Sequence, residues 1–128
     1  MRWRRSGRGR RSAVEMDADE LARADTLAFG GVGFAAQPLP ATEAYRRLEA
    51  ALPEQADQVR AAVDRLLAEG SPAGRAYAAT LLGRIDPTAA RAAWARLADA
   101  DGEFTTFSGC VMGRRALRDH AAEQLTAE

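Results

Sequence analysis

Cys110 is the one cysteine of the chain, and it lies in the stretch FTTFSGCVMG at 104–113. A catalytic thiol needs a lowered pKa and a base within hydrogen-bond reach. His120 is the only imidazole that could serve as this base, and Arg114 and Arg115 could stabilise a thiolate. Because the next helix is expected to begin just after this stretch, His120 lies two turns along it, roughly 10 Å away. The spacing therefore favours Cys110 as a small buried apolar residue. The alternative is that Cys110 is the reactive thiol of an enzyme or sensor.

The other polar residues form no pattern that is typical of an active site. One histidine and one cysteine cannot supply the four ligands of a structural zinc site. The segment GGVG at 30–33 lacks the Lys-Ser/Thr of a phosphate-binding loop. Glu43, Glu49, Asp57 and Asp64 each lie three or four residues from an arginine, the spacing of helix salt links. The sequence therefore predicts no cofactor, no metal and no catalytic residue.

The composition is that of a helical protein. The chain has 128 residues, which is long enough for one domain. Of these, 30 are alanine, the best helix former. All 18 basic residues are arginines, which indicates a GC-rich bacterial genome. No apolar run approaches the roughly 20 residues that span a bilayer, and a single cysteine suits a reducing compartment. We therefore expect a cytoplasmic protein without a membrane span.

The zero net charge conceals a basic arm on an acidic body. Residues 1–12 contain six arginines and no acid, so the rest of the chain carries 12 − 18 = −6. We expect 1–15 to be a disordered arm, and Met16 to be an alternative start. The alternative function is binding of nucleic acid or another polyanion through the arm. Its arginines are Arg2, Arg4, Arg5, Arg8, Arg10 and Arg11.

Apolar periodicity and capping signals predict a series of short helices joined by tight corners. Serine or aspartate followed by proline, at Ser71-Pro72 and Asp86-Pro87, is typical of a cap and a first helical residue. Tyr77 and Trp94 occupy positions expected in the core. The predicted segments are a helix at 13–28, a loop at 29–40, a helix at 42–52 capped by Thr42, one at 53–69 opened by Pro53, and helices at 72–85, 87–97 and 114–125.

The run GRAYAATLLGRIDPTAARAAWARLADAD at 74–101 resembles the HEAT-like helical repeat of bacterial proteins. It has an alanine-rich first helix, the ending Leu-Gly-Arg-Ile, and an Asp-Pro corner, but lacks the extra glycine that many members have before that corner. The resemblance implies an all-α fold of short antiparallel helices stacked as a small α-solenoid over 16–128, and scaffold, adaptor or regulator roles. We expect the small Gly83 to permit close helix crossing. The matching residues are Ala78, Ala79, Leu82, Gly83, Ile85, Asp86 and Pro87.

An insertion at 102–113 interrupts this pattern where a repeat needs only a short corner. Its apolar residues argue against disorder, and a Ser-Gly turn between Phe-Thr-Thr-Phe and Cys-Val-Met permits a hairpin. The insertion is predicted to be either a structural plug or the contact edge of a non-enzymatic protein-interaction module. The candidate partner-binding residues are Phe104, Phe107, Cys110, Met112, Arg114 and Arg115.

Overall fold

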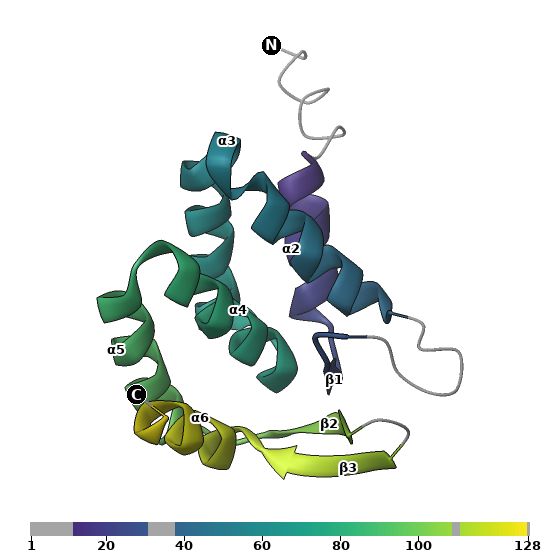
Figure 1. The fold of residues 1–128 in the computed structure, drawn as a ribbon, viewed down its shortest axis with the longest axis vertical. Helices are drawn as coiled ribbons and strands as arrows, with labels where there is room; N and C mark the ends of the chain where they lie inside the picture. The colour runs from purple at the N-terminus through teal and green to yellow at the C-terminus, as the bar shows by residue number, and fades with distance from the viewer. Residues whose placement is uncertain (1–11, 31–37, 109–110, 128) are drawn as a thin grey trace.

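The computed structural model describes residues 12–30, 38–108 and 111–127. The arginines of the arm, the GGVG loop from residue 31 onwards and Cys110 lie outside these ranges. The described part is mostly helical with one small sheet, as predicted in outline (Figure 1). In chain order its elements are α2 (Ala13–Ala22), β1 (Thr26–Leu27), α3 (Pro40–Glu69), α4 (Pro72–Ile85), α5 (Pro87–Leu97), β2 (Glu103–Ser108), β3 (Val111–Ala116) and α6 (Leu117–Thr126).

Three helix starts follow from local capping. The Ser12 hydroxyl accepts a hydrogen bond from the Glu15 amide, and the Glu15 carboxylate accepts one from the Ser12 amide. Ser71 and Asp86 cap α4 and α5 as predicted, each followed by proline. Because α2 begins at Ala13, the predicted boundary between arm and domain after residue 15 falls inside this helix.

One prediction for α3 was wrong, and another was right to within two residues. The helix begins at Pro40, so Thr42 is not a cap but a fully buried residue whose hydroxyl donates to the carbonyl of Ala28, 2.7 Å away. The predicted division into two helices near Pro53 is borne out to within two residues. The chain leaves helical geometry at Gln55, where φ and ψ are −132° and 38°, and the helix resumes and continues to Glu69.

The helix predicted at 13–28 ends six residues early, because the chain there joins a sheet. The strand β1 pairs in parallel with β2, with Thr26 opposite Thr105 and Leu27 opposite Thr106. β2 pairs antiparallel with β3, so the strand order is β1-β2-β3 and β3 is an outer strand. The predicted hairpin is confirmed, but it extends over 103–116, and α6 begins only at Leu117 rather than near residue 114.

Consecutive helices pack on one another from α2 to α6 and enclose the core. Tyr77 and Trp94 are buried, as predicted. The close helix approach occurs at Gly74, not at the predicted Gly83. A β-carbon on Gly74 would lie 2.4 Å from the carbonyl oxygen of Leu21 in α2, whereas one on Gly83 would meet Ala90 only at 3.9 Å.

Candidate functional site

The hairpin of β2 and β3 brings the predicted contact residues together. It lies along the lower side of the molecule in Figure 1, with β1 and α4 above it and α6 at its base. Phe107 lies directly opposite Met112, and Phe104 directly opposite Arg115. Cys110, at the turn, lies outside the described residues. Arg114 and Arg115 are strand residues, contrary to the prediction that they begin a helix.

Strand alternation divides these residues between two faces of the hairpin. Directly opposed residues share a face, and residues two apart along a strand share one too. Phe104 and Arg115 therefore lie on the face that packs on the helices, and Phe107, Met112 and Arg114 lie on the outer face. Phe104 is fully buried, so the prediction that it contacts a partner was wrong. Its side chain anchors the hairpin to the core instead.

The exposed apolar residues of the hairpin lie next to its turn. Val111 and Met112 have 69% and 65% of their surface exposed, and Phe107 is half-buried opposite Met112. We call Phe107, Val111 and Met112 the hairpin tip. Val111 was not among the partner-binding residues predicted from the sequence. It lies next to Met112 in β3, and its side chain is on the opposite face of the hairpin. The hairpin tip thus exposes apolar side chains on a hairpin whose base is buried through Phe104.

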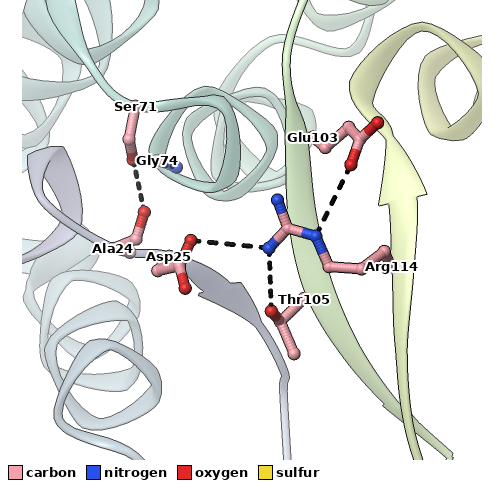
Figure 2. Close-up of polar contacts among 7 residues, drawn as sticks. All are labelled: Ala24, Asp25, Ser71, Gly74, Glu103, Thr105 and Arg114. Atoms are coloured by element: carbon pink, nitrogen blue, oxygen red, sulfur yellow. Dashed lines mark hydrogen bonds and ion pairs between the residues drawn. The ribbon is translucent and has the colours of Figure 1, made fainter.

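Arg114 organises the polar half of the outer face. Its Nη1 donates to the Thr105 hydroxyl at 3.0 Å and lies 3.7 Å from Asp25, and its Nε lies 3.5 Å from Glu103. Figure 2 shows the side chain extending from β3 across β2 towards Asp25. Asp25 also supplies the carbonyl that accepts the Thr105 amide at 2.9 Å. Arg114 thus links β3 to β2 and to Asp25, the residue just before β1.

His120 is a packing residue between the hairpin and the helices. Its ring contacts Trp94 and Phe104 edge-on, with centroids 5.4 and 5.6 Å apart. Burial lowers the pKa of His120 below its ordinary value of 6.5, and the Arg115 guanidinium lowers it further, whereas Glu123 raises it. The neutral imidazole is therefore favoured, which suits its aromatic surroundings.

The inner-face arginine, Arg115, is held by α6. Its Nη2 donates to the Asp119 carbonyl at 3.4 Å and lies 3.3 Å from the Glu123 carboxylate. Its Nε is buried and makes no hydrogen bond within the described residues. Like Arg114, it points away from the outer edge of β3.

Other parts of the described chain offer little chemistry. A groove of about 380 Å³ between the start of α2 and the second half of α3 contains Glu15, which caps α2, and Arg65, which lies 3.2 Å from Asp19. No group of three or more His, Cys, Asp or Glu among the residues described is arranged to hold a metal ion. No helix in those ranges is both long and apolar enough to cross a membrane.

Comparison with known proteins identifies no relative of this chain. No protein-family model matches the chain, and no curated protein or solved structure matches it. The surface therefore has to be interpreted from its own residues.

Proposed function

We propose that the protein is a non-enzymatic interaction module that binds a protein partner through the hairpin tip. The observation that carries the proposal is the exposure of Val111 and Met112 on a hairpin whose other end is buried through Phe104. Because burial of Phe104 fixes the base of the hairpin, a contact at the tip would lose less conformational entropy on binding than one on an unattached loop. In this proposal the chain acts as a scaffold, adaptor or regulator in the cytoplasm of a bacterium.

The helices supply the platform for this contact. Consecutive packing of α3, α4, α5 and α6 is compatible with HEAT-like stacking, and we propose that arrangement for 74–101. His120 and Phe104 lie in contact where the hairpin meets this helical layer. The tip is therefore presented at a fixed position relative to the stack.

The test is affinity capture from the native host, followed by binding measurements on purified partner. The double variant Val111→Ser, Met112→Ser is expected to weaken binding at least about tenfold, because apolar contact area is lost. The matched control is Met16→Ser on α2, which also removes an exposed methionine, 59% of whose surface is accessible. Far-ultraviolet circular dichroism checks that both variants remain helical. Equal binding by the wild type and the double variant would refute the assignment of the tip.

A further inference from the structure

The hydrogen-bond phase of the sheet shows which backbone groups of β3 point outward. The Thr105 amide donates to the carbonyl of Asp25, just before β1. The backbone N–H and C=O groups of Thr105 therefore point towards β1, and those of its two neighbours in β2 point towards β3. The Leu117 amide donates to the Gly102 carbonyl, which fixes the same alternation on β3. Gly113 and Arg115 therefore face β2, and Met112 and Arg114 direct their backbone N–H and C=O groups away from the sheet.

Among the described residues, no helix, strand or loop pairs with the outer edge of β3. Charged side chains commonly guard such edges against added strands. Here the Arg114 side chain crosses the sheet to Thr105 and Asp25 (Figure 2). The Arg115 side chain lies 3.3 Å from Glu123 on α6. Neither guanidinium covers the outer edge. No described element other than β2 pairs with β3.

We propose that β3 receives an extended segment of another protein as an added strand, a fourth strand in the sheet. The proposal rests on the interaction function above and specifies its mode. An added strand would bond to the outward groups of Met112 and Arg114, and its side chains would pass Met112 on one face and Val111 on the other. The segment is therefore apolar at two consecutive positions near the turn and carries no basic residue beside Arg114.

Charge disfavours a second copy of this chain as the occupant in two symmetric registers of β3. In the symmetric antiparallel register that pairs Met112 of each copy with Arg114 of the other, the two Arg114 side chains share a face one diagonal step apart, about 7–8 Å. The register that pairs Arg114 with itself places like charges directly opposite. A contact of six-residue strands alone also falls short of the roughly 1,200 Å² that stable interfaces bury.

A displayed library of random twelve-residue peptides, selected against the folded full-length chain, tests the proposal. We expect enriched peptides to be rich in apolar and β-branched residues and depleted of lysine and arginine. The best peptide is then synthesised with single N-methyl groups at successive amides. Because alternate amides of an added strand face β3, methylation should weaken binding at least about tenfold at every second position and little between them.

Two variants of the chain separate the backbone from the side chain. Met112→Pro removes an outward N–H without removing a bond to β2, and should weaken peptide binding at least about tenfold. Met112→Ala keeps the N–H and should have a smaller effect. The N-methyl series uses the wild-type chain, so it decides the matter even if the proline variant does not fold.

Each outcome has a distinct meaning. Loss of binding in Met112→Ala together with no alternation in the N-methyl series would overturn strand addition and leave the side-chain contact of the proposed function standing. Enrichment of no peptide, or of peptides indifferent to both variants, would overturn strand addition, while capture with the serine variants still judges the proposed function separately. Concentration-dependent dimerisation abolished by Met112→Pro would identify a second copy as the occupant and overturn the choice made here.

Discussion

Two buried hydroxyl groups hold the chain after β1 against the helices. The Tyr77 hydroxyl donates to the Ala28 carbonyl at 2.7 Å and lies 3.0 Å from the Ala28 amide, which donates to it. Thr42 donates to the same carbonyl. Both side chains are fully buried, so the Ala28 amide has no water to replace Tyr77. This network ties α3 and α4 to the end of β1.

Tyr77→Phe is expected to lower the free energy of unfolding by about 1–3 kcal/mol, because it leaves the buried Ala28 amide without an acceptor. Urea denaturation measures this change. The control is Tyr45→Phe, since the Tyr45 ring lies 5.6 Å from Tyr77 and its hydroxyl makes no hydrogen bond within the described residues. Burial raises the pKa of Tyr45 to about 12, so this phenol is neutral in the folded chain at neutral pH. Equal losses in the two variants would contradict the role of the Tyr77 hydroxyl.

Sequence reasoning at this scale identified burial better than bonding. Apolar spacing placed Tyr77 in the core, and it is there. Thr42 looked like a cap because threonine often precedes helices. Its true partner, Ala28, is 14 residues away and is reached only through the folded path of the chain. Long-range hydrogen bonds of this kind leave no periodic pattern.

Helix contacts in this protein depend on one glycine of α4 more than on the other. Gly74→Ala should destabilise the chain by about 1–3 kcal/mol, because the new methyl group would overlap the Leu21 carbonyl of α2. In Gly83→Ala, within the same helix, the new methyl group would reach only ordinary van der Waals contact with Ala90 at 3.9 Å, so the change should stabilise the chain by up to about 1 kcal/mol through helix propensity. Thermal denaturation of the two variants compares them. Stabilisation by both would mean that α2 shifts at little cost.

Attachment of α6 to the hairpin should depend on pH through His120. Because burial lowers the pKa of His120 in the folded chain, the unfolded chain binds its proton first as the pH falls through about 6.5. The free energy of unfolding is therefore expected to decrease from pH 7.5 to 5.5. Urea midpoints of the wild type and His120→Gln measure this slope. An equally steep slope in the variant would assign it to other groups.

The elements with local signals were the predictable ones. Ser71-Pro72 and Asp86-Pro87 mark helix starts that the structure confirms, because a cap and a proline act within one turn. Arg114 and Arg115 instead directly precede the helical spacing of Leu117, Ala121 and Leu125, so a helix was predicted from residue 114. Pairing with Thr105 and Phe104 makes them strand residues. Tertiary pairing thus overrides local propensity at the candidate surface.

The chain combines a basic N-terminal arm with a remainder whose net charge is 12 − 18 = −6. Deletion of residues 2–11 removes six arginines and leaves the Ser12–Glu15 capping box that begins α2. We expect the shortened chain to keep its melting temperature and to lose retention on DNA or RNA at low salt. Retention measured across a salt series tests this alternative function, binding of a polyanion through the arm. Unchanged retention after deletion, or retention insensitive to salt, would refute polyanion binding by the arm.

The parallel pairing of β1 with β2 has a consequence for synthesis of the chain. Thr26 and Thr105 are neighbours in the sheet but 79 positions apart along the polypeptide. An open array of repeats can acquire structure unit by unit as it leaves the ribosome. Here β1 has no strand to pair with until β2 has left the ribosome, although its end contacts α3 and α4. Nascent chains halted before residue 103 should consequently leave β1 more accessible to proteases than chains in which β2 has emerged.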